Sequence, residues 1–201
     1  MATKELKNIF LSASIPLPER DPKYFETADI IAIRDAIIAL TTVVIPKHKI
    51  IWGGHPSITP LIYYVMLKLG INIQEHVKLY QSLWFEDQFP EDNNKFENIV
   101  FTEKLQDSLP LSSIHLMRER MLSENEYSAA VFIGGMEGIE VEYGMFTEIY
   151  PEALLLPIAS TGAATRIVYD NRLPEQLKDE RLLKDYGYMS LFQDLLMKKI
   201  L

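Results

Sequence analysis

The stretch 131-VFIGGMEGIEVEYGMF-146 decides how the rest of the chain is interpreted. Its apolar run stops at two glycines, a third glycine follows at Gly138, and the carboxylates of Glu140 and Glu142 come next. An apolar run that ends at glycines and leads into a helix is typical of a buried parallel strand. Glycine amides at a helix start can hold a phosphate, but the same pattern also makes a tight turn without a ligand.

Composition limits the possible classes of protein. The chain has 201 residues, of which 48% are hydrophobic, and a formal net charge of −8. This size suits one large domain with a sizeable core, and an acidic chain gains nothing from counterion release on nucleic acid. The absence of cysteine excludes disulfides and thiolate chemistry. No signal peptide and no membrane span is predicted, so we expect a cytoplasmic protein that contacts neither nucleic acid nor membrane.

Strand-like and helix-like segments alternate along the chain. Strands are predicted at 8–14, 49–54, 76–82, 98–103, 129–135 and 153–160. Helices are predicted at 25–44, 56–70, 111–124, 139–150, 161–171 and 190–200, with 83–97 as a loop. This alternation predicts an α/β fold, a Rossmann-like three-layer sandwich with a mostly parallel sheet of about six strands. We expect a single domain over 1–201 with a C-terminal helical extension at 172–201.

Four predicted strands end in small or polar residues. These ends are 12-SAS-14, 53-GGH-55, the glycines of 134–138, and 160-STG-162. Because ligands bind beyond the carboxyl ends of parallel strands, we expect the four ends to form one site for a small anion or nucleotide. No Gly-Lys-Ser/Thr follows any glycine run, there is no G-x-G-x-x-G, and no His/Asp/Glu cluster suggests a metal. The sequence therefore predicts no metal and no cofactor.

The chain resembles the SLOG superfamily, which includes the Lonely Guy phosphoribohydrolases. In those enzymes an arginine-bearing helix precedes a Pro-Gly-Gly-x-Gly-Thr-x-x-Glu motif, and here 117-MRERM-121 precedes 133-IGGMEGIEVE-142 at nearly that spacing. The segment 51-IWGGHPSITPLI-62 resembles the family's first glycine-rich turn, and 157-PIASTG-162 resembles a later ligand loop. The likeness covers roughly residues 6 to 170.

The motif differs from that of the enzymes at several positions. Ile133 replaces the proline, one residue is inserted before Gly138, Ile139 replaces the threonine, and Glu119 stands where a lysine usually follows the arginine. These changes argue against the hydrolase activity of the family more than they argue against ligand binding. The resemblance is closer to sensor branches that accompany TIR, SIR2 or other effectors in bacterial antiviral defence, one of which binds a cyclic ADP-ribose isomer.

The resemblance implies a binding site for an ADP-ribose-like signal or a related phosphorylated nucleoside. Backbone amides near 54–57, 135–138 and 161–163 would hold phosphates, Arg118 would neutralise charge, and Glu142 would accept ribose hydroxyls. We also expect a homo-oligomer. The predicted ligand-binding residues are Ser12, Ala13, Ser14, Gly53, Gly54, His55, Pro56, Ser57, Arg118, Gly134, Gly135, Met136, Glu137, Gly138, Glu142, Ser160, Thr161, Gly162 and Ala163.

Two other functions stay open at this point. An N-glycosidase acting on nucleoside monophosphates would use Glu142 and Arg118 as its catalytic residues. A TIR-like domain would share the strand–loop opening, but the helix-borne arginine before the glycines speaks against it. Arg20, Asp21 and Tyr24 would either close over a ligand or form a polar surface loop.

Overall fold

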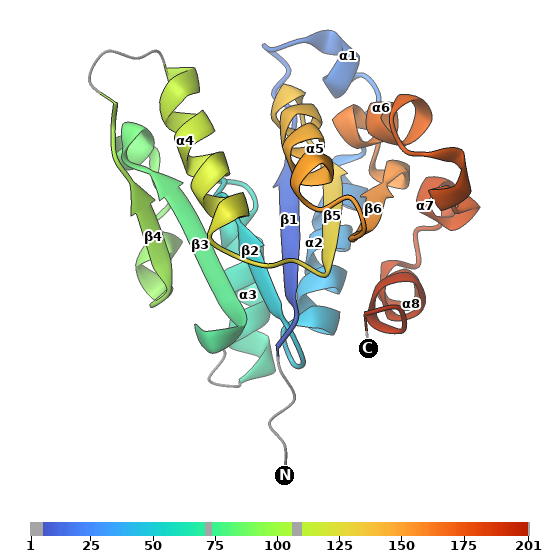
Figure 1. The fold of residues 1–201 in the computed structure, drawn as a ribbon, viewed down its shortest axis with the longest axis horizontal. Helices are drawn as coiled ribbons and strands as arrows, with labels where there is room; N and C mark the ends of the chain where they lie inside the picture. Colours follow the sequence, from blue (N-terminus) through green and yellow to red (C-terminus); the bar gives the residue numbers. More distant parts are fainter. Residues whose placement is uncertain (1–5, 71–73, 106–109, 201) are drawn as a thin grey trace.

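All six strands of the sheet run parallel, in the order β4-β3-β2-β1-β5-β6 (Figure 1). The computed structural model describes residues 6–70, 74–105 and 110–200. The strands are β1 (Asn8–Ser14), β2 (Lys49–Trp52), β3 (Val77–Ser82), β4 (Ile99–Thr102), β5 (Ala129–Gly134) and β6 (Leu154–Ile158). The predicted α/β class and six-stranded sheet are therefore confirmed.

The direction of chain progression reverses at β1. The chain first moves outward from β1 to β4, then returns through α4 (Pro110–Ser123) and places β5 on the other side of β1. In open parallel sheets ligands bind where the strand order reverses, outside the carboxyl ends. The junction of β1 and β5, at the upper edge of the sheet in Figure 1, is therefore the expected place for a site.

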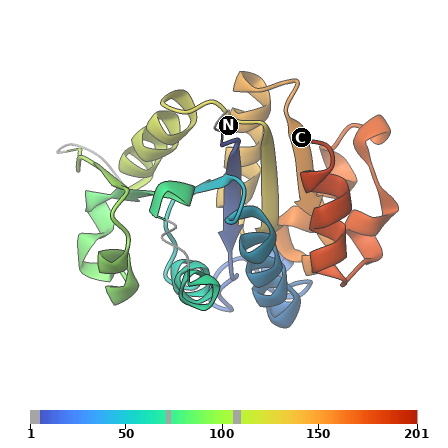
Figure 2. The ribbon, with the colours of Figure 1, turned by 90° about the horizontal axis from the view of Figure 1, so that it is seen from below.

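Helices cover both faces of the sheet (Figure 2). Helix α4 and α5 (Glu137–Ile149) lie on one face, and α2 (Ile30–Val44) and α3 (Thr59–Leu69) lie on the other. The short α1 (Pro22–Phe25) precedes α2. Beyond β6 come α6 (Ala163–Asn171), α7 (Glu180–Lys184) and α8 (Tyr188–Phe192), and α8 packs against α2.

Aromatic packing fixes α5 on the sheet. Phe10 of β1, Phe132 of β5 and Phe146 of α5 are fully buried. The Phe10 and Phe146 rings stack at 5.4 Å, and the Phe10 and Phe132 rings meet edge to face at 6.1 Å. Such pairs add to the free energy gained by burying the rings. The same packing determines which side chains of α5 face the carboxyl ends of the strands.

The elements differ from the sequence prediction mainly at their ends. Helix α2 begins at Ile30 rather than at residue 25, because the Asp29 carboxylate caps it by accepting from the Ala32 amide at 2.9 Å. The predicted loop at 83–97 contains two 3₁₀ turns, at Leu83–Gln88 and Glu91–Lys95. In the described part of the chain, none of the helices has the length and apolar character that crossing a membrane requires.

Candidate functional site

An arginine, a glutamate and a serine from three elements meet at the junction of β1 with α4 and α5. The Arg118 Nε donates to Glu142 Oε1 at 2.8 Å, and the Ser12 hydroxyl donates to the other carboxylate oxygen. Only 14% of each side chain of the ion pair is exposed. Arg118 and Glu142, both predicted as ligand-binding residues, thus lie in contact, and the Glu142 carboxylate is held by two partners.

The local structure explains why these groups converge. Ser12 lies two residues after Phe10, so both side chains are on the same face of β1. Glu142 lies one helical turn before Phe146, so burial of that ring turns the carboxylate toward the sheet. On α4, Met117 and Met121 are buried, and Arg118 between them extends toward α5.

Gly138 provides the space that the arginine occupies. A Cβ atom at this position would lie 2.8 Å from Nη2 of Arg118, which is closer than real Cβ contacts come. The guanidinium uses Nε to bind Glu142, and among the described residues its terminal nitrogens have no hydrogen-bond partner. Arg118 therefore presents unpaired N–H groups above the first turn of α5.

The turn between β5 and α5 has a backbone that requires glycine. Gly134 and Gly135 have φ angles of +62° and +78°, in the left-handed region that side chains disfavour. The Gly135 amide donates to the Ser14 carbonyl at 2.8 Å, which ties the end of β1 to this turn. The two glycines after the apolar run are therefore explained by the geometry of the turn itself.

The next three amides of this turn are open. Within the described residues, no acceptor is found for the amides of Met136, Glu137 or Gly138, and Met136 caps α5 without a side-chain hydrogen bond. Unpaired amides at a helix start, with the positive end of the helix dipole, favour an anion. Helix α5 has 13 residues, so its dipole is fully developed.

The turn after β2 is largely self-satisfied. The Ser57 amide donates to Nδ1 of His55 at 3.2 Å, and the His55 amide donates to the Thr59 hydroxyl at 3.3 Å. The amides of Ile58 and Thr59 both donate to the His55 carbonyl, and Pro56 has no amide hydrogen. Burial lowers the pKa of His55 to about 4, so the ring is neutral with its hydrogen on Nε2. One ring N–H can therefore face a ligand.

The turn after β6 is closed and buried. Ser160, Thr161 and Ala163 are at most 6% exposed. The Gly162 amide donates to the Ala159 carbonyl at 3.0 Å, and the Ala163 amide donates to the Thr27 hydroxyl at 3.0 Å. In this conformation these amides have no free hydrogen for a phosphate.

Instead, the turn after β6 supports the turn after β5. The Gly134 amide donates to the Thr161 hydroxyl at 2.9 Å, and the Thr165 hydroxyl donates to the Gly134 carbonyl at 2.8 Å. The Ala164 amide donates to the Gly135 carbonyl at 3.2 Å. Sequence reasoning did not identify Thr27 or Thr165, because their partners are too distant along the chain to leave a local signal.

The segment between β1 and α2 packs over the start of α5. Arg20 forms an ion pair with Glu137, the first residue of α5. The Tyr24 hydroxyl donates to Glu140 Oε1 at 2.5 Å, and its ring is 2% exposed. These contacts place Arg20 and Tyr24 beside the open amides, while Asp21 caps α1.

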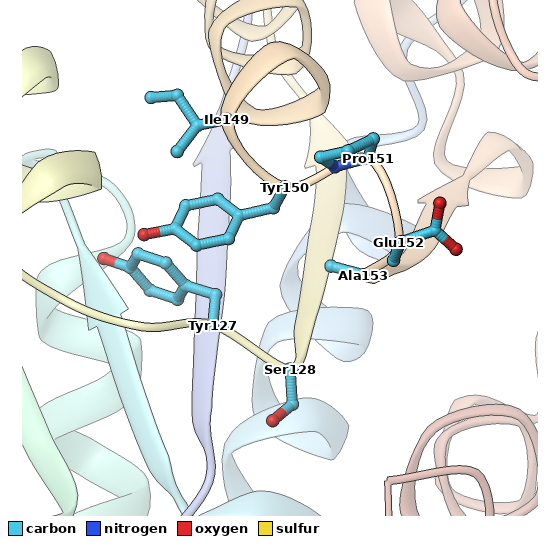
Figure 3. Close-up of a pocket in the computed structure, with 7 residues that line it drawn as sticks. All are labelled: Tyr127, Ser128, Ile149, Tyr150, Pro151, Glu152 and Ala153. Atoms are coloured by element: carbon cyan, nitrogen blue, oxygen red, sulfur yellow. The ribbon is translucent and has the colours of Figure 1, made fainter.

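A hollow of about 510 Å³ adjoins Arg118 on the outer side of the α4–α5 pair. Its lining is mainly apolar and consists of Leu105, Leu111, Ser112, His115, Leu116, Arg118, Glu119 and Val141. Figure 3 shows a different hollow, of about 350 Å³, where the Tyr127 and Tyr150 side chains lie side by side with their hydroxyls pointing in the same direction. Because it lies at the start of β5 and β6, this second hollow is at the opposite edge of the sheet from Arg118.

The predicted ligand residues thus lie in four different places. Those that meet at the β1–β5 junction are Ser12, Ser14, Gly134, Gly135, Met136, Glu137, Gly138, Arg118 and Glu142. Ala13 lies on the opposite face of β1 from both serines, because side chains alternate along a strand. Gly53, Gly54, His55, Pro56 and Ser57 lie at the same edge after β2, and 160–163 lie behind the β5 turn. No group of three potential metal ligands occurs in the described ranges.

The fold defines a Rossmann-like α/β protein, and its candidate site lies where the strand order reverses. The chain belongs to the SLOG cluster3 family, whose model matches residues 23–196. Membership of the SLOG superfamily, expected from the motifs, is therefore confirmed. None of the curated proteins compared with the chain matches it. The association with the sensor branches stays a prediction.

Proposed function

We propose that this protein binds a nucleotide-derived signal, such as ADP-ribose or a related phosphorylated nucleoside, at the β1–β5 junction. Membership of the SLOG family supports nucleotide-related binding or processing. One observation carries the proposal. The unpaired Nη2 of Arg118 lies against Gly138, whose amide is one of the three open amides at the start of α5.

Each part of the site matches a part of such a ligand. The guanidinium fork and the amides at the start of α5 suit a phosphate. The Glu142 carboxylate, already held by Ser12 and Arg118, suits a ribose diol, because an ionised carboxylate only accepts hydrogen bonds and hydroxyls donate them. The exposed Arg20 is close enough to contribute further positive charge once it leaves Glu137.

Calorimetry with ADP-ribose, cyclic ADP-ribose isomers and AMP tests the proposal. Arg118→Ala should weaken binding about a hundredfold, because the loss of one charge-assisted fork costs roughly 3 kcal/mol. Arg120→Ala is the matched control, since Arg120 is on the same helix and pairs with Glu103 and Glu124 away from the site. Failure of all these ligands to bind the folded protein would refute the proposal.

A second candidate function is cleavage of an N-glycosidic bond. It is favoured by the position of Glu142, a carboxylate with a partly buried side chain in contact with both an arginine and a strand-end serine. Such a carboxylate can stabilise an oxocarbenium-like centre or activate water. Release of free base from nucleoside monophosphates should then be lost in Glu142→Gln and kept in Glu148→Gln, an exposed residue of the same helix. Binding without base release favours the sensor.

The signal would be passed to another protein. Self-association and coupling to a TIR, SIR2 or other effector stay predictions from the family resemblance. Light scattering with and without ADP-ribose would test self-association directly. A ligand-dependent change in mass would support a signalling role, and a fixed mass would favour simple binding.

A further inference from the structure

We infer that Gln81, at the carboxyl end of β3, recognises the nucleobase of an adenine-containing, dinucleotide-like ligand. This inference rests on the proposed function, and it extends the site from the β1–β5 junction across β2 to β3. It concerns a residue that no sequence motif singled out.

Gln81 is an unusual residue for a strand. Its side chain is 6% exposed, and in the described parts of the chain no hydrogen bond of its amide to another residue is found, although the amide is not among the fully enclosed polar groups. No hydrogen bond within the described residues therefore gives this amide a structural role, and its polar atoms stay available to a ligand at the carboxyl edge. Among the described residues, the Asn93 amide and the Thr102 hydroxyl lack a partner as well, but unlike the Gln81 amide they are fully enclosed by the protein.

The turn after β2 accommodates this amide. A Cβ atom at Gly54 would overlap the Gln81 amide nitrogen and lie 2.9 Å from its oxygen. Gly54 follows β2 by two residues and Gln81 follows Leu79 by two, and Leu79 is paired with Trp52 in the sheet. The amide and the glycine are therefore opposite each other at the carboxyl edge.

The position of Gln81 sets the size of the ligand. The sheet order is β3-β2-β1-β5, so Gln81 lies three strand spacings, about 14 Å, from the open amides after β5. A ligand with a phosphate at α5 and a base at β3 must be elongated and must lie across the glycine turn after β2. In doubly wound folds, dinucleotides lie across this edge with their phosphates at a helix start.

The chemistry of the amide indicates the base. A glutamine side chain can accept from the adenine N6 amino group and donate to N7 at the same time. Hypoxanthine has an oxygen in place of the amino group, so it cannot complete this pair. We therefore expect the site to prefer adenine over hypoxanthine.

The test compares ADP-ribose, its hypoxanthine counterpart and ribose 5-phosphate on the full chain, with Gln81→Leu as the variant. The wild type should bind ADP-ribose at least about tenfold more tightly than the hypoxanthine compound. Gln81→Leu should reduce this preference to within about twofold and leave binding of ribose 5-phosphate unchanged. Its thermal midpoint should stay level, because no hydrogen bond within the described residues is lost.

Two more variants make the test specific. Gly54→Ala should displace the amide and also reduce the preference for adenine. Thr102→Val removes a sealed, unpaired hydroxyl at the end of β4 and should leave the preference intact.

Three outcomes would overturn the inference. An unchanged preference in Gln81→Leu, with ADP-ribose still bound, overturns it and leaves the proposed function standing. Equal losses for all three compounds with a lower midpoint would assign Gln81 a structural role. If the wild type binds none of the three, the proposed function falls and the role of Gln81 falls with it.

Discussion

The turns after β5 and β6 look alike in the sequence but differ in the folded protein. Both follow a buried strand, both contain glycine, and both lead into a helix. The turn at 134–138 leaves three amides open beside Arg118, whereas the amides of 162–164 all donate to protein acceptors. A glycine turn at a strand end can thus leave its amides unpaired or pair all of them, and the surrounding contacts decide which.

The largest expected effect is on the supporting turn. Gly162 has a φ of +70°, and a Cβ there would overlap the Thr27 carbonyl. Gly162→Ala should therefore lower the free energy of unfolding by about 3 kcal/mol or more, measured by urea denaturation. Gly70→Ala is the control, because Gly70 has a φ of +62° but no atom within 4 Å of its Cβ position. Equal losses at the two positions would show that the Thr27 contact has no importance.

The contact between the two turns can be removed separately. Thr161→Val removes the acceptor of the Gly134 amide, which becomes a buried, unpaired donor. We expect a loss of roughly 1–3 kcal/mol in unfolding free energy and weaker binding of ADP-ribose. Thr147→Val should cost much less, because the Thr147 hydroxyl donates only to carbonyls of its own helix. Full stability in Thr161→Val would contradict the supporting role.

Gly138→Ala tests the proposed phosphate-binding turn at 134–138. The added methyl group would displace the Arg118 guanidinium, so affinity for ADP-ribose should fall by about tenfold to a hundredfold. Stability should change little, because alanine favours a helix by about 1 kcal/mol over glycine. Gly144→Ala on the same helix meets only the flexible Arg172 side chain and should leave binding unchanged. If calorimetry gave the same affinity for both variants, Arg118 would not be in contact with the ligand.

The smallest effect concerns the turn after β2. Burial lowers the pKa of His55 from 6.5 to about 4, so the unfolded chain binds more protons between these pH values. Stability should therefore fall as the pH drops from 6.5 toward 4, and His55→Gln should reduce this slope. His115→Gln is the control, because His115 is exposed and its replacement should leave the pH dependence of stability unchanged. The same slope in all three proteins would show that His55 is not buried as described.

The sequence was a good guide to the fold and to part of the site. Apolar runs between turn residues predicted all six strands, and helical periodicity predicted the helices that cover them. The motif around Gly138 singled out Arg118 and Glu142, and their side chains form an ion pair in the folded protein. It did not distinguish the open turn from the closed one, because their amides are satisfied by Thr27, Ser14 and Gly135, which are distant along the chain or on other elements.

The sequence by itself determined the α/β class, the parallel sheet and the family, because these depend on local periodicity and short motifs. Only the tertiary structure decided which amides are free, which side chains meet, and that Gln81 lies unpaired against Gly54. The physical reason is that hydrogen bonding of a buried group depends on neighbours in space. In this fold those neighbours come from strands and helices that are far apart in the chain.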